Sequence, residues 1–406
     1  MSSAVDPNAI SRSSGRPDER RAMAVACGAH VLHDGYTDIV YVMLPVWQSE
    51  FALGFAALGL MKTVFSGTLA GFQVPSGLLA ERLGVPLVLA VGTALAGLGY
   101  CLAGFSTGVA ALMAALFVCG LGTSTQHPLG SSLIAQAYAG ARSRTALGTY
   151  NFAGDLGKMS LPVAASLLLL VLPWRPALML LGGCGLVAAV AIYLLAPRLP
   201  EPGVPPAKKE ATPQSLSRRI AFGFPLLLSV GMLDNATRAA FLTFLPFVLT
   251  AKGASLPTVG VALTLVFAGG AAGKLVCTFV GARIGTVPTV WLTETVTAAG
   301  MVALLPLPLE TSMILLPVIG VALNGTSSVL YGSVPDLVEA GKRSRAFGIY
   351  YTGTIGSGAV SPALYGLLGD AVGVPSALMA AAAIVLLTLP LTLLLRPALE
   401  RDPLAA

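Results

Sequence analysis

Charged residues are scarce in this sequence. They make up 10% of the 406 residues, whereas hydrophobic residues make up 55%. A soluble globular protein carries charge on about a quarter of its residues. A chain of this length with so few charges could not cover a water-facing surface, so the composition excludes a soluble globule.

The motifs of common enzyme classes are also missing. The five cysteines form no CxxC pair or other metal-binding spacing, and they all lie in apolar runs. There is no nucleotide-binding loop, no GxSxG and no HExxH motif, which argues against an ATP-driven pump, a serine hydrolase and a zinc protease. We therefore expect a protein that is not an enzyme and that holds no cofactor and no metal.

Long apolar segments are abundant. A helix needs about 20 apolar residues to cross ~30 Å of hydrocarbon. The first segment is too long for a signal peptide and contains His30 and Asp34. Twelve such segments are predicted, roughly at 22–48, 55–80, 85–104, 109–138, 146–172, 176–196, 219–250, 257–281, 287–306, 312–338, 346–368 and 374–395.

The placement of lysine and arginine predicts the orientation. With both termini in the cytoplasm, two of the 24 basic residues lie outside and four lie within helices, which leaves eighteen on the cytoplasmic side. The net charge of +6 then reflects orientation in a bacterial inner membrane, and we expect no nucleic-acid partner. The two outside are Arg175 and Lys252, and the four within helices are Lys62, Lys158, Arg238 and Lys274.

The two halves of the chain repeat each other. At an offset of about 200 residues, Asp34 matches Asp234, and AGARSR (139–144) matches AGKRSR (340–345). A hydrophilic, proline-rich linker separates the halves. The predicted organisation is a cytoplasmic tail (1–21), a six-helix bundle (22–196), a linker (197–218), a second six-helix bundle (219–396) and a cytoplasmic tail (397–406). Parallel repeats of this kind are typical of secondary transporters.

The segment GLLAERLG (77–84) resembles the signature loop of the major facilitator superfamily. Two further segments resemble one branch of this superfamily, the fosmidomycin-resistance branch. They are the stretch HVLHDGYTDIVYVMLPVWQSEFALGFAALGL and the His127–Pro128 pair. The resemblance implies an all-α membrane protein in which twelve transmembrane helices form two pseudo-symmetric six-helix bundles. It also implies a cytoplasmic gate, which we expect to comprise Gly77, Glu81, Arg82, Gly84, Asp336, Arg343 and Arg345.

Nine charged residues lie inside predicted helices. Unpaired, each would cost about 3 kcal/mol at the helix centre, and together they would exceed the ~5–15 kcal/mol stability of a typical fold. They must be paired, protonated or exposed to a water-filled cavity. They are Asp34, Asp38, Lys62, Asp155, Lys158, Asp234, Arg238, Lys274 and Glu294.

The densest cluster lies in the segment 22–48. His30, Asp34 and Asp38 follow each other at four-residue spacing, so they share one helix face, with His33 beside it. Burial and mutual repulsion favour protonated carboxyl groups, so we expect these four residues to bind the coupling proton. One alternative is a permanent ion pair between Asp34 or Asp38 and a cation such as Arg238. Another, a metal held by His30, His33 and Asp34, lacks a second ligand cluster.

The cations predict an anionic substrate, because fixed positive charges in a wet cavity attract carboxylates and phosphonates. The alternative for any one of them is an internal salt bridge. Asp155 is three residues from Lys158, where the two could neutralise each other. Glu294 is expected to be structural or to reach towards the membrane surface. The predicted substrate-binding residues are Lys274, Arg238, Lys158, Asp155, Asp234, Tyr36, Gln126, His127 and Asn151.

The sequence therefore predicts a monomeric, proton-coupled secondary transporter of a small anionic or amphiphilic organic solute in the lipid bilayer. The resemblance favours export by antiport. Uptake of an organic acid by symport remains open, because the segment TYNFAGDLGKMSLP lacks the Gly-Pro motif of drug antiporters. A receptor or scaffold that transports nothing is the alternative of another class.

Overall fold

The computed structural model describes residues 16–138, 141–199, 218–338 and 343–399, and these are helical almost throughout. The predicted linker and tails lie largely outside the described residues. The helices are α1 (Arg16–Phe51), α2 (Phe55–Leu83), α3 (Val85–Phe105), α4 (Val109–Thr123), α5 (Gln126–Ala137), α6 (Ala141–Leu168), α7 (Trp174–Leu195), α8 (Arg218–Ala251), α9 (Leu256–Ile284), α10 (Thr286–Leu304), α11 (Leu309–Ser333), the short η2 (Val334–Asp336), α12 (Arg343–Val372), α13 (Val374–Val385) and α14 (Thr388–Leu399).

Several of these helices join end to end. α4 and α5 continue one another across Ser124 and Thr125; Pro128 has no N–H to bond the carbonyl one turn earlier, which permits the break. Residues 109–137, 309–336 and 374–399 each count as one span, and eight spans in the described chain are long and apolar enough to cross a membrane. α1, α6, α8 and α12 are long enough but more polar, and α1, α6 and α8 carry six of the nine charged residues inside the bundle.

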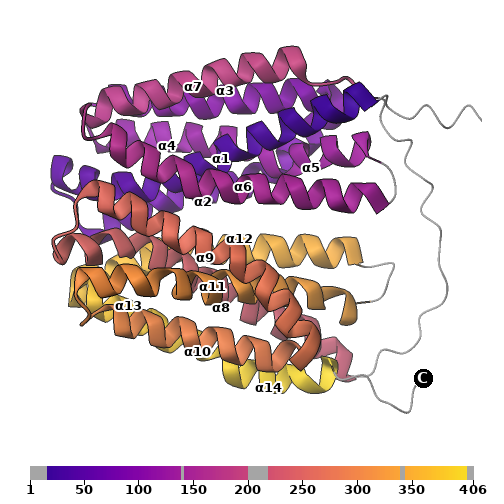
Figure 1. Ribbon diagram of the computed structural model, residues 1–406, viewed down its shortest axis with the longest axis vertical. Coiled ribbons are helices and arrows are strands. Elements are labelled where there is room, and N and C mark those ends of the chain that lie inside the picture. The colour runs from indigo at the N-terminus through magenta and orange to yellow at the C-terminus, as the bar shows by residue number, and fades with distance from the viewer. Residues whose placement is uncertain (1–15, 139–140, 200–217, 339–342, 400–406) are drawn as a thin grey trace, which may run out of the picture.

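The two halves of the chain lie against each other (Figure 1). Helices α1 to α7 form one layer of the view and α8 to α14 the other, and the beginning of α1 and the end of α14 lie at the same end of the molecule. The halves contact each other mainly through α2 with α12 and α6 with α9. We call the end that holds the beginning of α1 the near end and the opposite one the far end.

At the far end the halves are in close contact. A Cβ on Gly59 of α2 would lie 2.0 Å from the carbonyl oxygen of Pro362 in α12, and one on Gly260 of α9 would lie 2.1 Å from Ser166 Oγ in α6. Glycine is required at such contacts because any side chain would separate the backbones. The far end is therefore closed.

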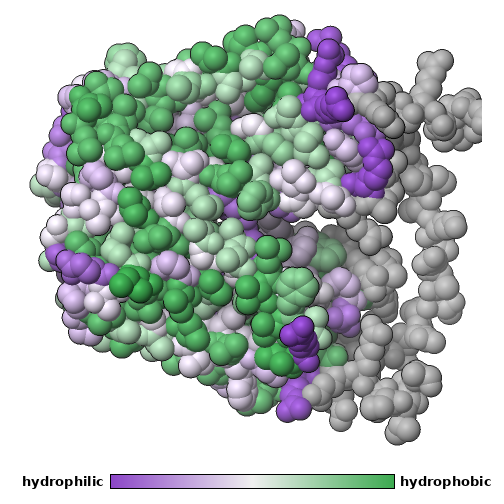
Figure 2. All heavy atoms as spheres, in the orientation of Figure 1, coloured by the Kyte–Doolittle hydropathy of each residue, from purple (hydrophilic) through white to green (hydrophobic). Residues whose placement is uncertain are grey.

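At the near end the halves separate. Figure 2 shows the surface hollowed between them on this side. Gly71 and Gly77 of α2, Gly148 of α6 and Gly348 of α12 have no atom within 4 Å of an added Cβ. The same helices that touch at the far end thus leave space at the near end. The two halves therefore enclose a cleft that is open at the near end.

Candidate functional site

The charged helices meet along the cleft between the halves. α1 packs closely on α6, because Gly157 lies against the backbone of Val31. A Cβ on Gly154 would lie 2.6 Å from His30 Nε2 and 2.7 Å from Asp34 Oδ2. The two glycines of α6 therefore let the polar face of α1 reach the residues that follow on α6.

Asp34 is the centre of a buried polar cluster. Its side chain is 7% exposed, and its Oδ2 lies 3.2 Å from Lys158 Nζ and 3.3 Å from His30 Nε2. His127 Nε2 lies 3.6 Å from the other carboxylate oxygen, and the His127 and Lys158 side chains are 33% and 31% exposed. One buried carboxylate thus contacts a partly exposed amine and two imidazoles.

The hydrogen bonds of His30 locate a proton in this cluster. Its Nδ1 lies 2.8 Å from the carbonyl oxygen of Tyr150, and a carbonyl only accepts, so Nδ1 carries a hydrogen. In a neutral His30, Nε2 then has a lone pair, yet it faces Asp34 Oδ2 at 3.3 Å. Two acceptors at this distance attract each other when one of them is protonated. The geometry suits a proton held between His30 and Asp34.

A second ion pair joins the halves. Lys274 Nζ on α9 lies 2.6 and 2.8 Å from the two carboxylate oxygens of Asp155 on α6. Asp155 and Lys158, which could have paired with each other, form no direct ion pair among the described residues, because their side chains turn to Lys274 and Asp34. Lys274 remains 38% exposed, so it faces both Asp155 and the cleft.

Asp38 and Lys62 lie deeper in the first half. Lys62 Nζ donates to the carbonyl of Thr37 at 2.9 Å and lies 4.1 Å from the ring centre of Tyr41. Asp38 is 5% exposed, and its Oδ2 has no hydrogen-bond partner in the part of the chain that the structure describes. The Asp38 carboxylate is therefore buried without an ion pair of the kind that Asp34 makes.

In the second half, Arg238 binds amides. Its guanidinium donates to Asn235 Oδ1 and, at 3.3 Å, to Asn324 Oδ1. The suggested ion pair between Arg238 and Asp34 or Asp38 is not made among the described residues. Asp234 is 2% exposed and hydrogen-bonded to Glu294. Asp234 therefore does not line the cleft in this state, and its placement at the substrate stays a prediction. Glu294 is 1% exposed and does not reach the membrane surface.

Three more predicted residues lie inside the first half and away from the cleft. Tyr36 is 0% exposed and donates to the carbonyl of Leu181. Gln126, also fully buried, is bonded to the Tyr150 hydroxyl. Thr93 donates to a backbone carbonyl, so His33 Nε2–H donates to Thr93 at 2.8 Å. These polar groups are thus hydrogen-bonded between helices of the first half. Asn151, in contrast, is exposed.

The signature loop lies at the near end. Glu81 and Arg82 are exposed, and neither makes an ion pair within the described residues. Asp336 and Arg345 are exposed as well, and the Arg343 side chain lies outside the described residues. Glu81 and Arg82 are therefore not engaged in the expected gate in this state.

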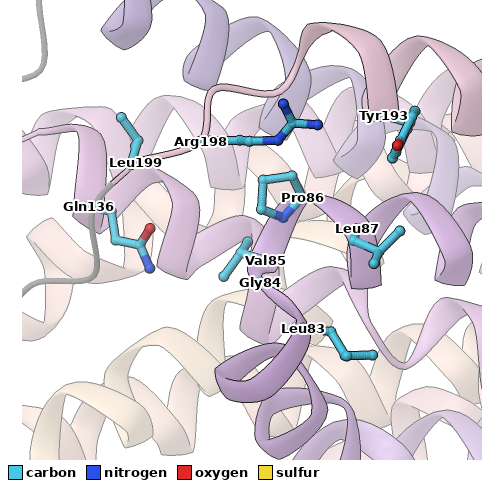
Figure 3. Close-up of a pocket in the computed structure, with 9 residues that line it drawn as sticks. All are labelled: Leu83, Gly84, Val85, Pro86, Leu87, Gln136, Tyr193, Arg198 and Leu199. Atoms are coloured by element: carbon cyan, nitrogen blue, oxygen red, sulfur yellow. The ribbon is translucent and has the colours of Figure 1, made fainter.

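Beside the loop is a pocket of about 230 Å³. Figure 3 shows Gly84 and Pro86 on one side of it and Arg198 projecting across from the segment after α7. Gly84 has φ +86°, a conformation that favours glycine. The pocket lies next to the end of α2, apart from the Asp34 cluster, and we assign no solute to it.

His30, Asp34 and His127 are the described residues whose geometry could hold a metal, with donor atoms within 4.8 Å of one another. The alternative set that included His33 is not assembled, because His33 binds Thr93. Lys158 already places a positive charge on Asp34, and a metal ion would have to displace it. The expectation of no metal stays a prediction.

Sequence reasoning missed two partners of these residues. Tyr150 supplies the carbonyl that orients His30, and Glu294 supplies the carboxyl group that meets Asp234. Tyr150 recurs in the repeat as Tyr350, but a backbone carbonyl leaves no signal of its own. Glu294 was visible as a buried charge, and only the packing of α10 shows what it contacts.

Known proteins resemble this chain in sequence and in fold. The model of the Major Facilitator Superfamily matches residues 26–233 and 227–405. The fosmidomycin resistance protein of Escherichia coli is 23% identical over 349 residues, or 84% of each chain. The 4-hydroxybenzoate transporter PcaK of Pseudomonas aeruginosa is 31% identical over 182 residues, or 44% of this chain and 40% of that one.

Two further matches bear on extent and fold. The uncharacterized MFS-type transporter YfnC of Bacillus subtilis is 26% identical over 166 residues, 41% of this chain and 39% of that one. A bacterial homologue of the human lysosomal transporter Spinster, inward-facing and occupied, has the same fold with a TM-score of 0.79 at 14% identity, over 96% of this chain and 100% of that one. Since the family model matches both halves, this chain belongs to the major facilitator superfamily, and it is a multi-pass membrane transporter of small solutes and not an enzyme.

Proposed function

We propose that the chain is a proton-coupled transporter of small organic anions, and that the near end faces the cytoplasm. The contact of 3.3 Å between His30 Nε2 and Asp34 Oδ2, which suits a shared proton beside the amine of Lys158, carries this proposal. Partly exposed cations of the cleft, Lys158 and Lys274, supply the anion site. The names of relatives support the substrate class, since 4-hydroxybenzoate is a carboxylate and fosmidomycin is a phosphonate.

The ion pair between Asp34 and Lys158 links the proton to the anion. While Asp34 is ionised it occupies Lys158; once Asp34 is protonated, the amine is free to bind an anion. By linkage, an anion bound to Lys158 favours protonation of Asp34 by the same factor. Proton and anion therefore bind together, and this geometry supports symport, which in a bacterial inner membrane means uptake.

Export by antiport is the second candidate. It is favoured by the likeness to the fosmidomycin resistance protein over 84% of both chains. In that reaction the anion and the proton would occupy the site in alternation, and the anion would have to bind while Asp34 is ionised. Lys274 is the cation for that mode, because its amine is 38% exposed.

Proton movement in liposomes distinguishes these functions. Purified protein in liposomes with an internal pH dye is given 4-hydroxybenzoate, fosmidomycin and L-galactonate in turn, with glucose as a neutral control. Symport acidifies the lumen when the anion is added outside, and antiport makes it more alkaline. If none of the anions moved protons, while binding to the protein was measurable, the chain would be a receptor and the proposal would fail.

A further inference from the structure

Two carboxyl groups of the second half share a hydrogen bond inside the protein. They belong to Asp234 on α8 and Glu294 on α10, and these residues are 2% and 1% exposed. An ionised carboxylate only accepts hydrogen bonds, so a bond between two carboxyl groups needs a proton on one of them. The pair therefore holds a proton in this state.

Few groups surround this carboxyl pair, and one of them is a cation. Glu294 Oε1 is buried and has no hydrogen-bond partner among the described residues. Thr326 on α11 contacts Glu294 from one side. The titratable groups that face Asp234 from neighbouring elements are the Tyr350 hydroxyl on α12 and the guanidinium of Arg238 on α8 itself. Arg238 is thus the cation that acts on the pair.

Arg238 lies one turn after Asp234 but does not bind it in this state. Its two nitrogens donate to Asn235 Oδ1 and Asn324 Oδ1. A neutral Asp234 offers little to a guanidinium, whereas an ionised Asp234 would offer a charge-assisted hydrogen bond stronger than one to an amide. Side chains four residues apart on a helix can reach each other. Loss of the proton would therefore attract Arg238 to Asp234.

We propose that the Asp234–Glu294 pair is a second proton-binding site, and that release of its proton moves Arg238 from Asn324 to Asp234. In this step the O–H bond of the protonated carboxyl group breaks, its electron pair stays on the carboxylate and the proton goes to water. Because Asn324 lies on α11, the move frees α8 from a contact with α11. Its consequence for transport rests on the proposed function, because it needs coupled movement of protons and anions; the proton site itself does not.

Infrared difference spectroscopy tests the site without any substrate. The full-length protein in lipid nanodiscs is titrated from about pH 5 to about pH 9, a range that spans the protonation of buried carboxyl groups. The wild type should lose a protonated-carboxyl C=O band as the pH rises. Glu294→Gln and Asp234→Asn should each remove that band, because the amide donates to the remaining carboxylate and keeps it ionised. Glu81→Gln, an exposed acid, should keep the band.

Two more variants test the link to Arg238. Arg238→Gln removes the cation that favours the ionised pair, so the midpoint of the band should rise by about one pH unit. Asn324→Ala releases Arg238 from its amide partner, and the midpoint should fall. A band that persists in both carboxyl variants, or a wild type without the band, overturns the proton site. Midpoints that stay unchanged in both Arg238→Gln and Asn324→Ala overturn the move of Arg238.

The outcome separates from that of the proposed function. If anions move no protons in liposomes but the band behaves as described, coupled transport is wrong and the proton site stands. If anions move protons while the band is insensitive to both carboxyl variants, the Asp34 cluster alone carries the proton. Thermal unfolding of each variant in the same nanodiscs confirms that the folded protein is being measured.

Discussion

Asp34 and Asp234 occupy equivalent positions of the repeat and have different chemistry. Asp34 contacts two imidazoles and the amine of Lys158 beside the cleft. Asp234 is hydrogen-bonded to Glu294. At an offset of 200, His30 and Lys158 correspond to Val230 and Gly358. The same acid is therefore retained in both halves, and the neighbouring helices decide what it binds.

The position that packs beside each of these acids is also repeated, and a different residue occupies it in each half. At an offset of 201, Thr93 corresponds to Glu294. Thr93 accepts a hydrogen bond from His33, one residue before Asp34, whereas Glu294 bonds Asp234 directly. In the first half, His33 and Thr93 thus form a hydrogen bond at this position, and Asp34 is left to face the cleft. In the second half, two acids, Asp234 and Glu294, meet there.

The largest expected effect comes from neutralising the acid of the first half. Asp34→Asn cannot accept the proton and frees Lys158, so proton-driven flux should fall about 100-fold while anion binding is retained. Asp38→Asn should reduce the flux less, because among the described residues Asp38 makes no ion pair comparable to those of Asp34. Flux into liposomes and equilibrium binding of 4-hydroxybenzoate are measured side by side, with Glu50→Gln at the far end as the control. Loss of binding with normal flux per bound anion would contradict the assignment.

A smaller effect, on anion affinity, is expected when a cation of the second half is replaced by the residue found at the equivalent position of the first half. Lys274 corresponds to Gln73, and Lys274→Gln removes a charge-assisted hydrogen bond of about 1.5–3 kcal/mol, or tenfold or more in the dissociation constant. Isothermal titration with fosmidomycin and 4-hydroxybenzoate measures this. The double variant Lys274→Gln, Asp155→Asn removes the unpaired acid as well. If it restored wild-type affinity, Lys274 would only neutralise Asp155.

The sequence predicted the fold better than it predicted the contacts of the site. Apolar length, basic residues and the repeat depend on composition and order, and the helical architecture followed from them. The family followed from the resemblance of GLLAERLG (77–84) to a known signature loop. It also indicated which helices carry the charges. It could not indicate partners: Asp155 lies three residues from Lys158 yet binds Lys274, 119 residues away. Tyr36 and Gln126 were expected in the cavity because they are polar, but each finds its partner within its own half.

Helix capping differs between the halves and gives a further prediction. α9 is capped by its own Ser255, whose side chain accepts from Thr258 N. In α2 the N–H groups of Phe55 and Ala56 donate to Asp370 of the other half at 2.6 and 2.9 Å. Loss of a cap costs about 1 kcal/mol, so Asp370→Ala should shift the balance about fivefold towards the state open at the far end.

Cysteine accessibility measures this shift. A cysteine at Gly59, at the closed contact, would clash, so the label is placed at the buried Ser166, which meets Gly260 across the closed end, in a background free of other accessible cysteines. Faster labelling in Asp370→Ala than in the parent supports a lock at the far end. Ser255→Ala is the matched control, because it removes a cap within one half and should leave the rate of labelling unchanged.

The smallest expected effect is at the signature loop, where the halves differ again. Glu81 corresponds to Ala282 at an offset of 201, so only the first half has the acid. Glu81 is exposed and unpaired among the described residues of this open state, and we expect it to bind the basic loops when the near end closes. Removing a contact made in one state alone shifts the equilibrium by the energy of that contact, and an exposed ion pair contributes little. Glu81→Gln should therefore favour the state open at the near end about twofold, with anion binding unchanged.

Distances between spin labels on the near ends of α2 and α12 report this population, and Asp18→Gln serves as an acid removed elsewhere at the same end. Unchanged distances and an unchanged transport rate in Glu81→Gln would show that this loop does not bias the two states.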